Sequence, residues 1–262
     1  MESDAKSVFL LDVEERKNLI RSLELLGDTF ALVSETERLY DTLPDLCRLP
    51  NDVETNDSTF AAGLTGSLLS ICRRQLTIGT LTLLRGYAND SQIHLRRAIE
   101  TCAFSARMSK HPHMARIWLG AGNSDEAFEK FRKTFVKLFP DDDAQLKLLG
   151  QQYDVCSKAM HSGIYGAAHH LSRPRRNAPG RSIDGFDVGT EGKLVTVFFV
   201  SVFSHMTILR VFERLLSPYA GSRISQWTEH LGALEGQYTT RHKEWMPVVK
   251  AEGERLKAEG LR

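Results

Sequence analysis

Apolar residues recur at steps of three and four along almost the entire chain. In the first long segment these positions are Leu19, Leu23, Leu26, Phe30 and Val33. This spacing places side chains on one face of an α-helix, whereas a half-buried strand would alternate apolar and polar residues. No alternation of convincing length occurs, and no internal repeat is found. The sequence therefore predicts an all-α fold, a helical bundle of six or more helices.

Prolines and glycines divide this helical pattern. The first helix is expected to run from about Lys6 until Pro44 and Pro50 stop it. One stretch, 171–192, loses the period and contains two prolines, four glycines and four arginines, as expected of a loop. We therefore expect a single all-helical domain over 1–262, in which this irregular loop separates the N-terminal helices from the last two.

The most apolar segment runs from Leu194 to Leu209 and continues as a helix to Leu216. A helix that is apolar nearly all round is tolerated only where other elements cover it, so Leu194–Leu216 is predicted to be the most buried helix. The apolar run is shorter than the ~20 residues that a membrane span requires, and His205 interrupts it. No membrane association is expected.

Composition narrows the function classes. The chain has 34 basic and 33 acidic residues, a net charge of +1, so bulk electrostatics do not indicate nucleic acid. Four scattered cysteines without a C-x-x-C pair indicate unpaired core thiols in a reducing compartment. The acidic N-terminus does not resemble a signal peptide, and we expect a cytoplasmic protein.

The common motifs of cofactor and metal chemistry are missing from the sequence. There is no phosphate-binding glycine loop, no dinucleotide-binding glycine pattern and no H-E-x-x-H zinc helix. A G-x-S-x-G nucleophile elbow is missing as well. We therefore expect neither a cofactor nor a bound metal.

Two helices carry a polar face beside their apolar stripe. Arg96 and Glu100 are four residues apart and can pair along one helix, and a second polar face accompanies the helix from Tyr153 to His161. We expect Arg96, Glu100 and His161 to lie close together, with His161 or Tyr153 completing the hydrogen bonds that a buried ion pair requires. These four residues are the candidate ligand-binding set. A purely structural network would have the same sequence pattern.

A family resemblance involves the same positions. "LLRGYANDSQIHLRRAIETCAFSARMSKHPHMARIWLG" followed by "YDVCSKAMHSG", within 83–163, resembles a pattern in bacterial helical proteins of unknown function. In that pattern a leucine-rich helix with Arg and Glu four apart precedes a Tyr–Ser–His helix, here Arg96, Glu100, Tyr153, Ser157 and His161. Those proteins are similar to the HEPN superfamily, many of whose members act in RNA cleavage, toxin–antitoxin and phage-defence systems. The resemblance implies a HEPN-like up-and-down core with extra helices, and a role in bacterial stress or phage defence.

The resemblance also implies an enzymatic alternative. HEPN ribonucleases share an arginine followed within a few residues by a histidine, and Arg107 and His113 fit this spacing, as do Arg223 and His230. The chain's arginine and histidine content makes two such matches expected by chance. Met108 replaces the polar residue usual after the family arginine, and Pro112 lies inside the match. In this alternative Arg107 would stabilise phosphate charge and His113 would act as acid and base without a metal.

Two functions thus remain open from the sequence. One is a helical interaction or ligand-binding protein, which could bind another protein; the other is the HEPN-type ribonuclease, and only there would RNA be a partner. A homodimer is expected in either case. Two-fold dimers are the commonest closed assemblies, and the last helix carries the aromatic anchors Trp227, Tyr238 and Trp245.

Overall fold

The chain folds as an all-α helical bundle, as predicted. The computed structural model describes residues 2–48, 56–120, 124–134, 138–160 and 190–258, and these parts contain no strand. The α-helices are α1 (Glu2–Leu26), α2 (Ala31–Leu46), α3 (Asp57–Leu84), α4 (Ala88–Lys110), α5 (His113–Gly120), α6 (Asp125–Thr134), α7 (Ala144–Met160), α9 (Glu191–Ala220) and α10 (Ile224–Ala258). Two short 3-10 helices, η1 (Gly27–Phe30) and η2 (Gly221–Arg223), connect neighbouring helices.

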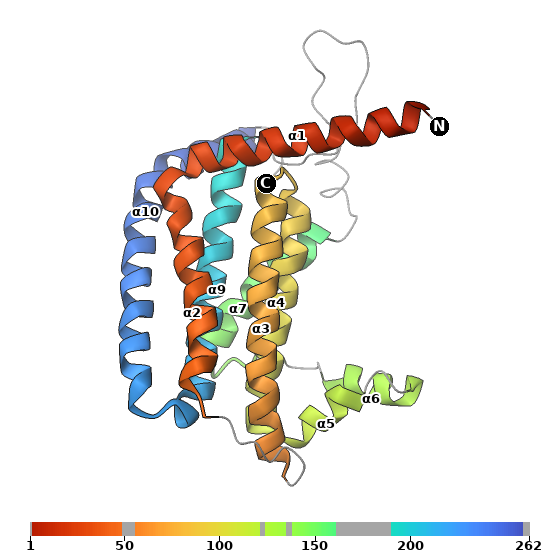
Figure 1. Cartoon of the computed structure of the whole chain (residues 1–262), viewed down its shortest axis with the longest axis vertical. Helices are drawn as coiled ribbons and strands as arrows, with labels where there is room; N and C mark the ends of the chain where they lie inside the picture. Colours follow the sequence, from red (N-terminus) through yellow and green to blue (C-terminus); the bar gives the residue numbers. More distant parts are fainter. Residues whose placement is uncertain (1, 49–55, 121–123, 135–137, 161–189, 259–262) are drawn as a thin grey trace.

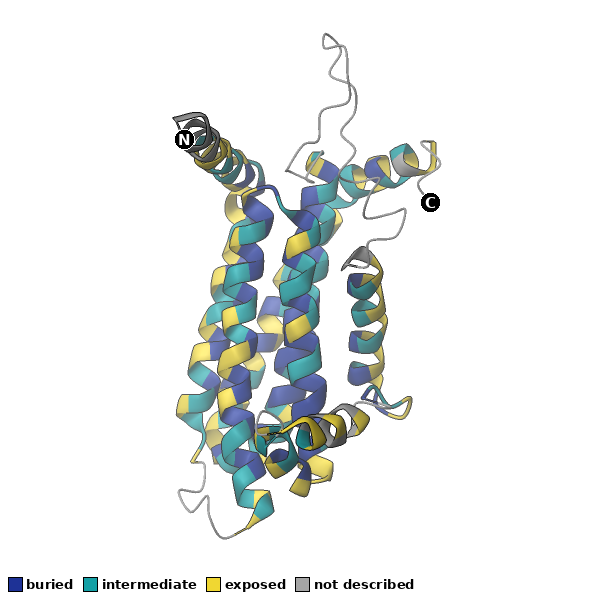
Figure 2. Cartoon of the chain, turned by 90° about the vertical axis from the view of Figure 1, so that its right-hand side faces the viewer, coloured by how far each residue is buried: buried dark blue, intermediate teal, exposed yellow. Residues whose placement is uncertain are grey.

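The long helices lie side by side along the long axis of the molecule (Figure 1). α1 crosses one end of the bundle, while α5 and α6 project from the other. Buried residues form stripes along the helices, with exposed residues on the opposite faces (Figure 2). The hydrophobic core contains residues from both sides of 161–189, so helices from both parts of the chain contribute to one core.

The prediction of one continuous first helix is wrong. The helix is interrupted at η1, where Gly27 has a φ of +48°. This left-handed conformation is open to glycine and does not continue an α-helix, so α1 and α2 take different directions (Figure 1). Leu23, expected on the buried face, is 38% exposed because α1 crosses the bundle end. Pro44 does not stop α2, which continues to Leu46.

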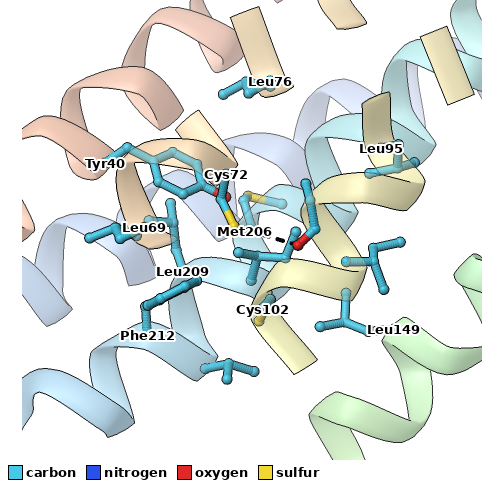
Figure 3. Packing of buried hydrophobic residues seen from close by; sticks show 14 of the residues in the cluster. Tyr40, Leu69, Cys72, Leu76, Leu95, Cys102, Leu149, Met206, Leu209 and Phe212 are labelled. Atoms are coloured by element: carbon cyan, nitrogen blue, oxygen red, sulfur yellow. Dashed lines mark hydrogen bonds between the residues drawn. The ribbon is translucent and has the colours of Figure 1, made fainter. Parts of the chain in front are cut away.

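α9 is the central helix, as the apolar pattern of Leu194–Leu216 predicted. It contains more buried residues than any other helix in the described parts of the chain, and it packs against α2, α3, α4, α7 and α10. Its Met206, Leu209 and Phe212 meet side chains of α3 and α4 in the core (Figure 3). The length argument against a membrane span does not hold, because α9 is long and apolar enough to cross a bilayer. That apolar window is, however, 67% buried against protein.

His205 lies in the centre of this core. Its side chain is 1% exposed, and the hydroxyl of Tyr40 on α2 lies 2.9 Å from its Nδ1. The same hydroxyl is 3.3 Å from the His205 carbonyl oxygen. Burial lowers the pKa of His205 to about 3, so the ring is neutral near neutral pH. The sequence marked this histidine only as an interruption of an apolar run.

The aromatic residues of α10 pack against the core of their own chain. The Trp227 ring is buried, and its Nε1 donates to the carbonyl of Leu39 at 3.1 Å. Tyr238 and Trp245 are partly buried against the core. These residues therefore close the core, and they no longer support the expected dimer interface.

The last turns of α10 return to the beginning of α9. Glu252 is 7% exposed and forms two hydrogen bonds with Arg255, at 2.6 and 3.0 Å. A Cβ atom at Gly192 would lie 2.5 Å from the Cβ of Glu252. This contact is possible only because residue 192 has no side chain.

The four cysteines are unpaired, as predicted. Cys72, Cys102 and Cys156 are buried, whereas Cys47 is only partly buried at the end of α2. Burial raises the pKa of the Cys156 thiol to about 12 and also raises that of Cys102. These thiols are therefore protonated and poorly nucleophilic.

Candidate functional site

Three of the four predicted ligand-binding residues come together between α4 and α7. Nη2 of Arg96 donates to the Tyr153 hydroxyl at 2.7 Å, and that hydroxyl donates to Oε1 of Glu100 at 2.8 Å. The Nε of Arg96 is 3.4 Å from the same carboxylate oxygen. The guanidinium carbon of Arg96 also lies 4.7 Å from the centre of the Tyr153 ring. The fourth residue, His161, lies outside the described residues.

This polar cluster of Arg96, Glu100 and Tyr153 is joined through the Tyr153 hydroxyl, whereas the buried Nε of Arg96 forms no hydrogen bond with the described residues. Burial raises the pKa of the Tyr153 phenol, and its hydrogen bond to Glu100 raises the pKa further, so the phenol remains protonated. Ser157, the neighbouring position of the family pattern, donates to the Tyr153 carbonyl at 2.7 Å. The arrangement links α7 to α4 through the hydrogen bonds of the Tyr153 hydroxyl.

The predicted ribonuclease residues occupy different settings. Arg107 is partly buried on the last turn of α4, whereas His113 is exposed at the first residue of α5. The His113 ring lies 6.3 Å from that of His111. In the second match, Nη2 of Arg223 donates to the carbonyl of Leu46 at 2.6 Å and so caps α2.

A cleft of about 820 Å³ lies at the other end of the α4–α7 contact. It is bounded by the last turns of α4, the start of α7, the second half of α9 and the first turns of α10. Its lining residues are Ala106, Ser109, Lys110, Asp142, Asp143, Ala144, Gln145, Arg210, Glu213, Arg214, Leu215, Ser217, Ile224 and Thr228. Arg107 and His113 are not among these lining residues, and the residues of the polar cluster are not among them either.

One wall of the cleft is a hydrogen-bonded charge network between α9 and α10. Arg210 donates to the two carboxylate oxygens of Glu235 at 2.8 and 2.6 Å and to Glu213 at 2.9 Å. The second oxygen of Glu213 accepts from the Thr228 hydroxyl. The hydrogen bonds to Glu235 raise the pKa of Arg210 above its already high ordinary value. Arg210 therefore carries its charge and links α9 to α10 through Glu235.

A second ion pair links α9 to the start of α7. Nη2 of Arg214 lies 2.6 Å from Oδ2 of Asp143, and Oδ1 of Asp143 accepts from the backbone N–H of Leu146 at 3.1 Å. Burial alone would raise the pKa of Asp143, but these two hydrogen bonds outweigh it and keep the pKa below its ordinary value. Asp143 thus caps α7 and holds the Arg214 guanidinium at the cleft.

Sequence reasoning missed the residues of this cleft. A usable signal existed, since Arg210, Glu213 and Arg214 interrupt one face of an otherwise apolar helix at steps of three and one. Charges in a helix that is apolar on its other faces indicate ion pairs with neighbouring elements. The partners, Asp143 and Glu235, are far away in the sequence and carry no local signal.

Comparisons with protein-family models, with curated proteins and with solved structures each found no match. Within the described residues, no group of three or more His, Cys, Asp or Glu side chains is placed to hold a metal ion.

Proposed function

We propose that this chain is a ligand-binding helical protein that uses the cleft between α4, α7, α9 and α10. The single observation that carries this function is the cleft itself, which has the volume of a small-molecule site. Two ion-paired elements, the Arg210 network and the Arg214–Asp143 pair, hold its walls. Pre-organised polar walls of this kind favour specific binding because little side-chain ordering is needed.

The settings of Arg107 and His113 support ligand binding over the ribonuclease alternative. A general acid–base pair must reach the same reacting atoms. Neither residue lines the cleft, and the His113 side chain is exposed. Under this proposal the purified protein does not cleave RNA. Cleavage that is lost in both Arg107→Ala and His113→Ala would contradict it.

Ligand binding in the cleft is tested by a substitution that fills the cleft with a large side chain. Ser109 is exposed, lines the cleft and lies near the end of α4, so Ser109→Trp should reduce the open volume without disturbing the core. Ser70→Trp, at an exposed position of α3, is the matched control. In a thermal-shift screen of small polar metabolites, compounds that stabilise the wild type and Ser70→Trp should not stabilise Ser109→Trp. Equal responses of all three proteins to every compound would contradict ligand binding in the cleft.

The broader assignment uses the family resemblance for the helix arrangement and the role, and the unpaired cysteines for the localisation. We propose a HEPN-like arrangement of the helices and a role in bacterial stress or phage defence. We also propose a cytoplasmic protein that does not associate with a membrane and that could bind a protein partner.

We further propose a two-fold dimer, now only because such dimers are the commonest closed assemblies. Light scattering at micromolar concentration should give about twice the 29.5 kDa chain mass; the mass of one chain would contradict the dimer.

A further inference from the structure

Most charged groups of the cleft already satisfy one another. Arg210 uses Nε, Nη1 and Nη2 in hydrogen bonds to Glu213 and Glu235. Both oxygens of Glu213 accept hydrogen bonds, one from Arg210 and one from Thr228. A ligand would gain little from these groups, because each contact would replace an existing charge-assisted hydrogen bond.

Two cationic side chains of the cleft retain donors. Lys110 is exposed on the last turn of α4 and forms no ion pair with the described residues. Arg214 is 49% exposed, and within the described chain its guanidinium makes one hydrogen bond, from Nη2 to Asp143. The hydroxyl of Ser109, one residue before Lys110, lines the same cleft.

The lining has three carboxylates, Asp142, Asp143 and Glu213, against the three cations Lys110, Arg210 and Arg214. Glu213 is already bonded to Arg210. The Asp143 side chain is 8% exposed, and its carboxylate accepts hydrogen bonds from Arg214 and from the backbone N–H of Leu146. Asp142 is the remaining carboxylate of the lining. It is exposed, as Lys110 is, so water and salt screen both charges alike.

We infer that the cleft binds the anionic group of a small molecule, a carboxylate or a phosphate, between Arg214 and Lys110. A guanidinium fixed by Asp143 presents planar N–H donors that match both anions, and a lysine ammonium adds a second charge from the facing helix. This inference rests on the proposed function and names the chemical class that its site takes.

The experiment uses two probes, inorganic phosphate and succinate, each compared with sodium chloride at equal ionic strength. Binding to the full chain is measured by calorimetry and by the shift in melting temperature. Lys110→Gln removes one contact at a position with no ion pair in the described chain, so the fold should be unaffected. Arg214→Lys keeps a positive charge beside Asp143 but removes the planar donors. Lys250→Gln, an exposed position near the other end of α10, is the control.

We expect phosphate or succinate to bind more tightly than chloride, and the preferred probe to identify the anion. Lys110→Gln and Arg214→Lys should each weaken that binding about tenfold, the usual effect of losing one charge-assisted hydrogen bond, and Lys250→Gln should leave it unchanged. The inference is overturned if neither anion binds better than chloride, or if both cleft variants bind like the wild type. Suppose that in this case other compounds of the screen stabilise the wild type and Ser70→Trp but not Ser109→Trp. The ligand-binding function then stands, and only the anionic class of the ligand is wrong.

Discussion

The buried histidine of α9 makes stability depend on pH in a predictable direction. His205 has a folded-state pKa of about 3, against 6.5 for a histidine in water. Above pH 6.5 the ring is neutral in both states, and the contribution to stability is complete. As the pH falls below 6.5, the unfolded chain binds a proton that the core excludes, so stability is lost through the window from 6.5 down to about 3.

The magnitude follows from the same two values. Crossing the whole window costs about 4 to 5 kcal/mol, since each pKa unit corresponds to about 1.4 kcal/mol. Between about pH 7 and about pH 4.5, the loss due to this one ring is about 2 to 3 kcal/mol. Other histidines and carboxylates also titrate in this range, so the effect has to be isolated by comparison with a variant.

His205→Phe supplies that comparison. The phenyl ring retains the edge contact that Tyr40 makes with residue 205, and the Tyr40 hydroxyl keeps the carbonyl of residue 205 as an acceptor. Urea unfolding at the two pH values gives the loss of free energy for the wild type and for the variant. The wild type should lose about 2 to 3 kcal/mol more than His205→Phe. His230→Gln, at an exposed position of α10, should lose as much as the wild type.

Equal losses in the wild type and His205→Phe would refute this reasoning, because the ring would then be protonated in the folded protein and could not lie in the apolar core. If His205→Phe does not fold, Tyr40→Phe removes only the hydroxyl beside Nδ1. The ring stays buried in that variant, and burial is the cause of the lowered pKa, so its pH-dependent loss should be close to that of the wild type. A clearly smaller loss would likewise contradict the burial argument.

Three further predictions concern stability and are measured by thermal or urea unfolding. Glu100→Gln should lower the free energy of unfolding by about 1 kcal/mol, because the carboxylate of the polar cluster loses its charge. The control Glu244→Gln, in an exposed ion pair, should have almost no effect on stability. Equal effects of the two substitutions would contradict a structural role of Glu100. Gly192→Ala should destabilise by about 2 kcal/mol, because the new Cβ would overlap Glu252, and unchanged melting would show that the end of α10 does not pack there. Gly236→Ala, where nothing lies within 4 Å, should instead stabilise α10 by up to about 1 kcal/mol; a loss would indicate a close neighbour at this face.

Features that depend on neighbouring residues along the chain were determined by the sequence. The apolar spacing predicted an all-α bundle, and the continuous apolar surface of Leu194–Leu216 predicted the central helix. The meeting of Arg96 and Glu100 with Tyr153 was also anticipated, since each helix has a polar face beside its apolar stripe. Helical periodicity is a local property, because each residue is hydrogen-bonded to its own helix four positions away.

Tertiary structure alone decided which faces meet and where chains turn. The break at Gly27 depends on a single left-handed residue, and the role of Trp227 depends on the helix against which it packs. At the cleft, Arg214 meets Asp143, 71 positions away, and Arg210 meets Glu235 on the next helix. The local sequence shows the charged residues of α9 but not the partners that they meet. Such pairs are selected by the packing of whole helices, in which burying an unpaired charge costs more than any local preference contributes.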